Sequence, residues 1–205
     1  GVLFIANLGG RANAMKLLLG GMALSAVCSA FSSFIIYFAQ DKEGIQTITY
    51  WMMGSLAGAK WEHMALIGGI TALAVLFFWS QSRILNLMLL GDESAITLGT
   101  DLHPYRQGYL IVSALVVGFA VFAAGMIGFV GLVVPHVVRM LVGTDHKRLI
   151  PVTALTGAIF LVIADGLCRV LIPHTELPIG ILIALVGAPA FIYLMVKRTY
   201  GFGGQ

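Results

Sequence analysis

The side chains best suited to chemistry in this sequence are five histidines and two cysteines. The histidines are His63, His103, His136, His146 and His174. No two of them have the spacing of a metal site such as HExxH, and the sequence has neither a nucleophile–base motif nor a GxxxxGK loop for the phosphates of ATP. Both cysteines lie in apolar runs, which favours buried thiols over a disulfide. We therefore expect no metal site, no bound cofactor and no enzymatic activity in this chain.

One ion pair can be predicted from spacing alone. Arg169 follows Asp165 by four residues, so the two side chains share one face of a helix. Both lie toward one end of an apolar segment, and charged groups at that depth in a membrane are costly and usually paired. The sequence therefore predicts an Asp165–Arg169 pair near a membrane surface.

The composition shows which kind of element must position these residues. Of 205 residues, 59% are hydrophobic and 10% are charged, and the mean hydropathy is +0.96. Soluble domains carry about 25% charged residues, so a water-soluble globule is excluded, as are a disordered chain and a disulfide scaffold. The net charge of +3 comes from scattered basic residues, which do not indicate nucleic-acid binding. Long apolar runs instead predict an all-α membrane protein, and not a β-barrel.

The uncharged runs locate the membrane helices. Five runs lack Asp, Glu, Lys and Arg: 17–40, 64–82, 107–138, 149–164 and 177–196. The third has 32 residues, about 48 Å as a helix, which exceeds the roughly 30 Å of hydrocarbon even with tilt. Its second half holds glycines at three-residue spacing and a proline, which allow a bend, a break or close helix packing: Gly125, Gly128, Gly131 and Pro135. We therefore divide this run into two crossings.

Six crossings follow from this division, and the basic residues support them. The predicted helices cover about 16–38, 63–81, 107–124, 127–142, 150–170 and 177–196. With both ends of the chain on the cytoplasmic side, nine Lys and Arg residues lie inside and three lie outside: Lys42, Lys60 and Arg169. A single crossing over 107–138 would reduce this asymmetry to seven against five. The positive-inside rule therefore favours six crossings.

Two connecting segments are long enough to form structure of their own. Segment 41–62 contains an apolar stretch too short to cross, which predicts a helix lying at the outer surface. The inner segment 83–106 predicts one or two short helices with a break at Gly91, and Asp92 or Ser94 as the N-cap of a helix ending at Gly99. An ordered loop of this length is either a docking surface for a cytoplasmic partner or a plain connection between two spans.

Three stretches resemble one family of transport proteins. Residues 85–99 are LNLMLLGDESAITLG, similar to the LNxLxLGxExAxxLG pattern of the FecCD-type permeases, the vitamin B12, haem and ferric-siderophore subunits of bacterial ABC importers. Residues 125–158 and 164–198 resemble two further blocks of that family, and WMMGSLAG at 51–58 resembles its outer gate helix. The resemblance implies a BtuC-like fold of ten membrane helices. By this resemblance the chain looks like the last six of them plus the end of the fourth. It begins with Gly1 and an apolar tail, so we expect it to be the C-terminal part of a longer permease domain.

The resemblance implies a role for several residues. Those expected to seat in a groove of a cytoplasmic ATPase are Leu90, Gly91, Asp92, Glu93, Ala95, Leu98 and Gly99. Arg169 is expected to receive a carboxylate from a solute-binding protein, a task that suits its forked guanidinium, and the pair with Asp165 can exchange when that partner docks. The expected gate helix covers about 45–53, and the expected gate and helix-break residues are Trp51, Gly54, Gly125, Gly128, Gly131 and Pro135.

The resemblance also implies the assembly. Such a permease pairs with a second copy in the bacterial inner membrane, binds two ATPase subunits that carry ATP and Mg, and receives solute from a periplasmic or lipid-anchored binding protein. The alternative is a secondary transporter driven by an ion gradient, a class that often carries acids at mid-membrane. Asp165 lies toward the end of its span, which favours the importer. The transported solute is not specified by these residues.

Overall fold

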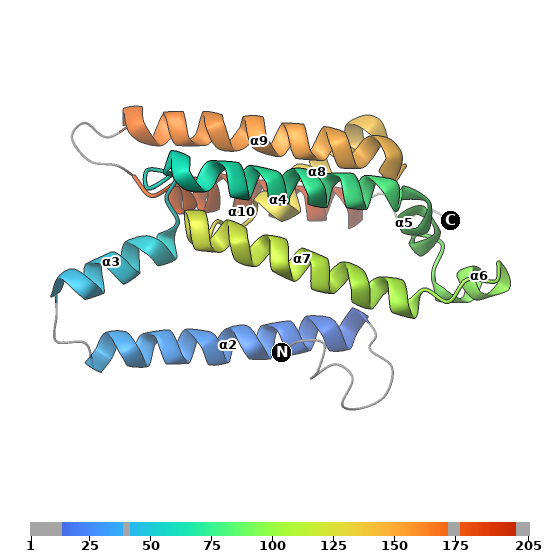
Figure 1. Ribbon diagram of the computed structural model, residues 1–205, viewed down its shortest axis with the longest axis horizontal. Coiled ribbons are helices and arrows are strands. Elements are labelled where there is room, and N and C mark those ends of the chain that lie inside the picture. Colours follow the sequence, from blue (N-terminus) through green and yellow to red (C-terminus); the bar gives the residue numbers. More distant parts are fainter. Residues whose placement is uncertain (1–13, 39–41, 172–176, 200–205) are drawn as a thin grey trace. The chain divides into compact units, whose positions relative to one another are not determined.

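The regular secondary structure in the described part of the chain is all α-helix, as the apolar runs predict. The computed structural model describes residues 14–38, 42–171 and 177–199 (Figure 1). Within them lie α2 (Ala14–Phe38), α3 (Lys42–Met53), α4 (Trp61–Ser80), α5 (Ser82–Met88), α6 (Asp92–Thr97), α7 (His103–Ala124), α8 (Val130–Val142), α9 (His146–Leu171) and α10 (Ile179–Thr199). The chain divides into two units, Gly1–Thr49 and Tyr50–Gln205, which are described separately. The first contains α2 and most of α3, and the second contains the remaining helices.

Every predicted crossing corresponds to a helix, but the helices differ in length. Four are long and apolar enough to span a membrane: α2, α4, α7 and α9. The other two are shorter, since α8 has 13 residues and a length of about 20 Å, and the apolar part of α10 is Ile179–Tyr193. The number of six crossings therefore stays a prediction, whereas the helical nature of all six segments is confirmed.

The run 107–138 is two helices, as its length predicts. Helix α7 ends at Ala124, and Gly125 follows with a φ of 70° while its N–H bonds the carbonyl of Val121. Helix α8 begins only after Phe129, whose φ of 62° is left-handed, an unusual conformation for a bulky residue. The chain between Ala124 and Val130 is therefore non-helical, and α8 starts three residues later than predicted.

In the second unit, α9 packs against α4, α8 and α10, and α4 also packs against α7 (Figure 1). One buried cluster joins α9 to α10 through Ala164, Cys168, Ile179 and Ile183. Another joins α8 to α9 through Val134, Val138 and Leu149. These two clusters hold three helices together, so α9 is the central element of this unit.

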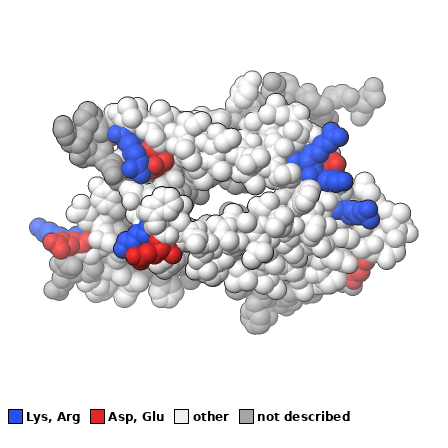
Figure 2. All heavy atoms as spheres, turned by 45° about the horizontal axis from the view of Figure 1, so that its top comes forward, with Lys and Arg blue, Asp and Glu red and all other residues white. Residues whose placement is uncertain are grey.

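Large apolar side chains cover much of the outer surface of the second unit. On α9, Leu155 is 66% exposed and Val162 is 72% exposed. Charged side chains instead gather near helix ends, with uncharged atoms between them on the face drawn in Figure 2. An apolar band between charged ends suits hydrocarbon and not water.

Candidate functional site

The segment 83–106, here called the coupling segment, forms two short helices and two glycine turns. Helix α5 ends at Met88, and Gly91 precedes α6 with a φ of 88°. No side chain caps α6, so the prediction of Asp92 or Ser94 as N-cap is wrong. Asp92 is already the first helical residue, because Gly91 makes the turn with a backbone conformation that side-chain-bearing residues rarely adopt. The break at Gly91 itself is where the sequence places it.

The end of α6 is fixed by a Schellman motif. The N–H of Gly99 bonds the carbonyl of Ile96 at 2.9 Å, and the N–H of Thr100 bonds the carbonyl of Ala95 at 2.9 Å. Gly99 has a φ of 80°, which suits the position that this motif reserves for glycine. Ala95 is fully buried. A glycine turn therefore lies on each side of α6, and the two turns fix where this short helix begins and ends.

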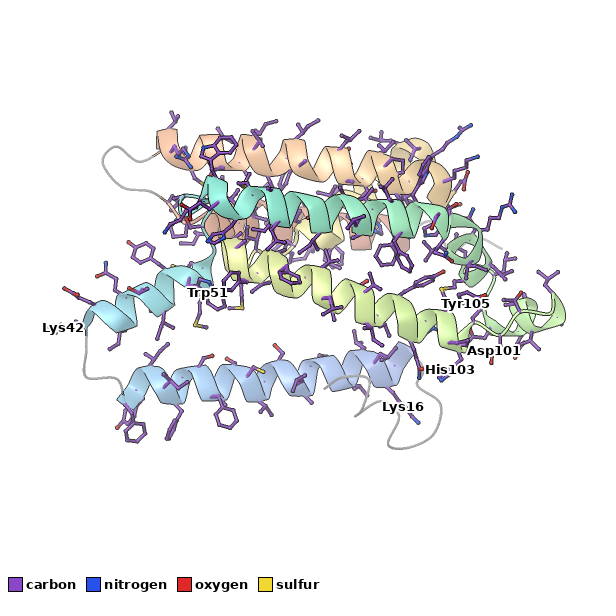
Figure 3. The ribbon with its side chains drawn as sticks, viewed as in Figure 1. Lys16, Lys42, Trp51, Asp101, His103 and Tyr105 are labelled. Atoms are coloured by element: carbon purple, nitrogen blue, oxygen red, sulfur yellow. The ribbon has the colours of Figure 1, made fainter. Side chains whose placement is uncertain are left out.

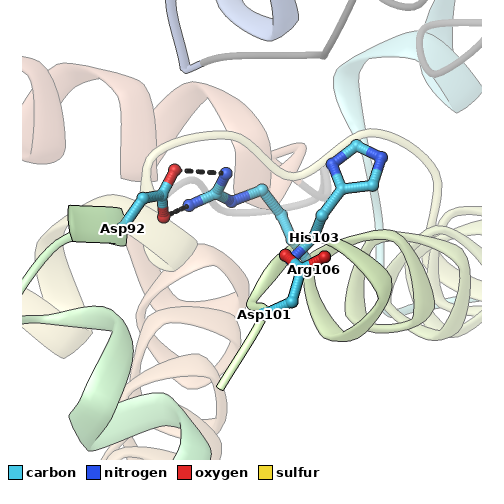
Figure 4. Close-up of polar contacts among 4 residues, drawn as sticks. All are labelled: Asp92, Asp101, His103 and Arg106. Carbon is cyan, nitrogen blue, oxygen red and sulfur yellow. Dashed lines mark hydrogen bonds and ion pairs between the residues drawn. The ribbon is translucent and has the colours of Figure 1, made fainter. Parts of the chain in front are cut away.

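An ion pair fastens α6 to the start of α7. Both terminal guanidinium nitrogens of Arg106 donate to the Asp92 carboxylate, Nη2 at 2.7 Å and Nη1 at 3.2 Å (Figure 4). The hydrogen bond from Arg106 holds the pKa of Asp92 below its usual value of 3.8. A lowered pKa in the folded state means that the pair stabilises the fold above pH 3.8, and that this stabilisation is lost as the pH falls through the lowered pKa. At neutral pH both groups are therefore charged and paired.

The start of α7 is polar and well anchored. Figure 3 places Asp101, His103 and Tyr105 together at this end of α7. The Asp101 carboxylate accepts the His103 N–H at 3.0 Å, which satisfies one of the free donors of the first helical turn. The coupling segment therefore continues into α7, a helix long enough to cross a membrane, and the connection is held by this hydrogen bond and by the Asp92–Arg106 ion pair.

The tip of the coupling segment presents apolar side chains to solvent. Leu90 is 60% exposed, Ile96 is 60% exposed and Leu98 is 65% exposed. These residues lie beside the exposed carboxylate of Glu93 and outside the stretches that are apolar enough to cross a membrane. An exposed apolar cluster on a rigid, charged segment is typical of a surface that binds another protein.

A second group of predicted residues meets at the opposite end of α7. Trp51, near the end of α3, lies beside the C-terminal end of α7 (Figure 3). Its carbonyl accepts the N–H of Gly54 at 3.2 Å and that of Met126 at 3.4 Å, and the Ser55 N–H bonds the Ala124 carbonyl at 2.9 Å. Two backbone segments, 51–55 and 124–126, are therefore in direct hydrogen-bonded contact here.

Glycine makes this contact possible. A Cβ on Gly125 would overlap the Trp51 carbonyl oxygen, and a Cβ on Gly180 of α10 would overlap the Met53 carbonyl oxygen. A Cβ on Gly54 would lie 2.7 Å from the Met126 carbonyl oxygen. We call these three residues the glycine junction: Gly54, Gly125 and Gly180. The sequence singles out the first two, but not Gly180, which lies at the start of α10 among ordinary helix-forming residues.

The remaining predicted gate residues lie elsewhere. Gly128 is in the non-helical link and Gly131 is in the first turn of α8, so Gly125, Gly128 and Gly131 do not share one helical face. Apart from adjacent parts of the chain, no atom of the described residues lies within 4 Å of a Cβ built on Gly128 or Gly131. Pro135 lies inside α8, where it removes one backbone donor. The gate role of these residues stays a prediction.

The predicted Asp165–Arg169 pair is present. Arg169 Nε donates to Asp165 Oδ2 at 2.8 Å across one turn of α9. The Arg169 side chain is 51% exposed, whereas that of Asp165 is 23% exposed. Arg169 is therefore half exposed while it is paired with Asp165.

A family comparison decides the identity of the chain. The model of the FecCD transport family matches residues 1–197. The chain belongs to this family. Among curated FecCD relatives, it is 38% identical over 197 residues to the hemin transport system permease protein HmuU of Yersinia pestis, covering 96% of this chain and 59% of that protein. It is 42% identical over 186 residues to the vitamin B12 import system permease protein BtuC of Salmonella typhi, covering 90% and 56%.

A solved structure of a metal-chelate type ABC transporter in an inward-facing conformation has the same fold. The TM-score is 0.84 at 38% identity, over 90% of this chain and 60% of that one. The chain therefore spans somewhat more than half the length of the FecCD proteins that it matches.

Three residues of this FecCD chain hold the coupling segment in place although its motif alone does not reveal them. Arg106 pairs with Asp92, and Asn86 bonds Asp145, which is 59 residues away in sequence. In the sequence, Arg106 stands out only as a single basic residue near the start of a span. Asn86 stands out only as a polar residue among the leucines of the motif at 85–99. The sequence gives no indication of the partner of either residue.

Proposed function

We propose that this chain is part of the permease subunit of an ATP-driven importer for an iron chelate, haem or a cobalamin-like solute. Membership of the FecCD family supports a transport role without chemistry in this chain. The observation that carries the proposal is the coupling segment, which presents Leu90 and Leu98 to solvent on a backbone fixed by Gly91, Gly99 and the Schellman motif. A rigid apolar surface of this kind suits contact with an ATPase subunit whose conformational change displaces the coupling segment by a few ångströms.

The proposed assembly follows from the family. Two copies of the full-length permease enclose the solute path in the bacterial inner membrane. Two ATPase subunits, which carry ATP and Mg, bind the coupling segments from the cytoplasm. A solute-binding protein docks at the other side, near Arg169. Both ends of the present chain are cytoplasmic in this arrangement.

Transport assays with the full-length permease test this function. The permease is reconstituted in vesicles with its ATPase subunits and with ATP and Mg inside, while the binding protein and radiolabelled haemin, cyanocobalamin or a ferric siderophore are outside. Uptake of one of these solutes is expected with ATP and not with a non-hydrolysable analogue. Uptake that ignores ATP and instead follows an imposed proton or sodium gradient would favour the secondary transporter.

Reversing the charge of Arg169 is expected to weaken docking of the binding protein. In Arg169→Glu the incoming carboxylate meets a like charge, so the affinity should fall by about tenfold or more, which corresponds to at least ~1.4 kcal/mol. Surface plasmon resonance on the full-length permease in nanodiscs measures the affinity.

Asp165→Asn is the matched control for this experiment. It keeps the guanidinium and removes the negative charge that Arg169 contacts at 2.8 Å. Its affinity for the binding protein should equal or exceed that of the wild type. An unchanged affinity in Arg169→Glu would show that the arginine does not contribute to docking of the binding protein.

A further inference from the structure

The beginning of α9 lacks one of its own hydrogen bonds and receives a replacement from α4. Pro151 lies in the second turn of α9 and has no N–H, so it cannot bond the carbonyl of Lys147 four residues earlier. The indole Nε1 of Trp79, near the end of α4, donates to this carbonyl at 3.0 Å. The proline therefore creates a vacant acceptor, and a neighbouring helix uses it to fix the position of α9.

Helix α5 makes a second and more specific attachment at the same place. The Asn86 amide nitrogen donates to Asp145 Oδ1 at 2.8 Å. The Asn86 amide oxygen accepts the backbone N–H of His146 at 2.9 Å and faces the His146 Nδ1 at 2.7 Å, which pairs well when that nitrogen carries the proton. Both ends of one amide are thus used by two successive residues at the start of α9.

Asp145 is itself held by the helix that it precedes. Its Oδ1 accepts the Lys147 N–H at 3.1 Å, and its backbone carbonyl accepts the N–H groups of Arg148 and Leu149 at 3.1 and 2.9 Å. These bonds satisfy donors of the first turn of α9. The hydrogen bond from Asn86 is the main reason that the pKa of Asp145 lies below 3.8, so the carboxylate is ionised at neutral pH. Asn86 therefore forms its hydrogen bonds with the fixed start of a helix and not with a flexible loop.

We propose that Asn86 is a positioning residue that joins the coupling segment to α9, so that displacement of the segment moves this helix. The inference rests on the proposed function. The two halves of the segment are attached to different helices, since Asp92 of α6 pairs with Arg106 of α7 whereas Asn86 of α5 binds the start of α9. Helix α9 is continuous over 26 residues, about 39 Å, and carries Arg169 at its other end. One helix thus connects the attachment of α5 with the proposed docking residue.

A charge swap tests whether this contact is the link. In Asn86→Asp two carboxylates face each other where an amide now donates to Asp145. The double variant Asn86→Asp with Asp145→Asn restores a donor on one side and an acceptor on the other, and the new carboxylate still accepts from His146. The assay uses the full-length permease assembled with its ATPase subunits in nanodiscs. It measures ATP hydrolysis with and without the solute-binding protein.

The expected result is a change in the ratio of stimulated to basal hydrolysis. We expect Asn86→Asp to lower this ratio by about fivefold or more, the lower range of allosteric coupling, and the double variant to restore it to within about twofold. Gln107→Leu is the matched control, because it removes an amide whose described contact is to His103 of its own helix, and it should keep the wild-type ratio.

Each other outcome has a defined meaning. An unchanged ratio in Asn86→Asp, or a lowered ratio that the double variant does not restore, overturns the role of Asn86 and leaves the proposed function intact. If Asn86→Asp does not assemble, Asn86→Ala replaces it, and a ratio equal to that of the wild type then overturns the inference. Failure of the wild-type complex to hydrolyse ATP would instead count against the proposed function.

Discussion

Replacing Gly125 with alanine is expected to lower the free energy of unfolding by about 2–5 kcal/mol, the sum of two separate costs. The first is conformational, because a φ of 70° costs a residue with a Cβ about 1–2 kcal/mol. The second is steric, because the new methyl group would overlap the Trp51 carbonyl oxygen. Backbone atoms cannot rotate away as a side chain can, so three connected segments would have to separate at the glycine junction.

Two other glycines of this chain separate these costs. Gly143 has a φ of 86° but open space beside it, so Gly143→Ala should lose only the conformational term, about 1–2 kcal/mol. Gly128 has no positive φ, and a Cβ built on it meets no other described segment within 4 Å, so Gly128→Ala should change stability by less than about 0.5 kcal/mol. Thermal unfolding of the full-length permease in detergent measures all three. Equal losses for Gly125→Ala and Gly143→Ala would show that the glycine junction is not closely packed.

Leu98→Asp is expected to separate the permease from its ATPase. Leu98 is 65% exposed at the tip of the coupling segment, where the proposed ATPase groove would cover it. A carboxylate buried there without a partner costs several kcal/mol, and a buried apolar anchor at the centre of an interface contributes 2 kcal/mol or more by itself. Recovery of the ATPase in co-purification should therefore fall by about 30-fold or more.

Leu98→Met is the matched control, because it keeps the apolar volume of the side chain. It should bind the ATPase as the wild type does. Leu98 belongs to neither of the buried clusters found among the described residues, so both variants should reach the membrane in equal amounts. ATPase recovered at the wild-type level with Leu98→Asp would place the docking surface elsewhere.

The helices of this protein are predictable because the signal for them is local. Uncharged runs set α2, α4, α7, α8, α9 and α10, and the excessive length of the run 107–138 requires the break that Gly125 makes. The starts of helices are less predictable. Helix α7 begins at His103, four residues before the predicted start, because Pro104 in its first turn and the Asp101 carboxylate favour initiation there. A helix start that is predicted from the end of an uncharged run misses a first turn that contains polar or charged side chains.

The contacts that give the site its rigidity are not predictable in the same way. Asn86 meets Asp145 only because α5 folds back along α9, and the sequence separation of 59 residues carries no periodic signal. Gly180 resembles any glycine of an apolar helix until the Met53 carbonyl is placed against it. The Asp165–Arg169 pair is the exception, because a spacing of four within one helix is enough to bring its charges together.

The orientation of the chain can be measured directly by cysteine labelling. All native cysteines of the full-length permease, Cys28 and Cys168 among them, are first replaced by alanine. Single cysteines are then introduced as Glu93→Cys in the coupling segment, Lys147→Cys at the start of α9 and Gly58→Cys between α3 and α4. The label is a maleimide that does not cross membranes, applied to spheroplasts before and after permeabilisation.

Positions 93 and 147 are expected to react only after permeabilisation, whereas position 58 is expected to react in intact spheroplasts. Asn86 bonds both Asp145 and His146, so the first two positions must share one side of the membrane whichever side that is. Labelling of position 93 from outside, or of positions 93 and 147 from opposite sides, would contradict a permease whose coupling segment meets an ATPase in the cytoplasm.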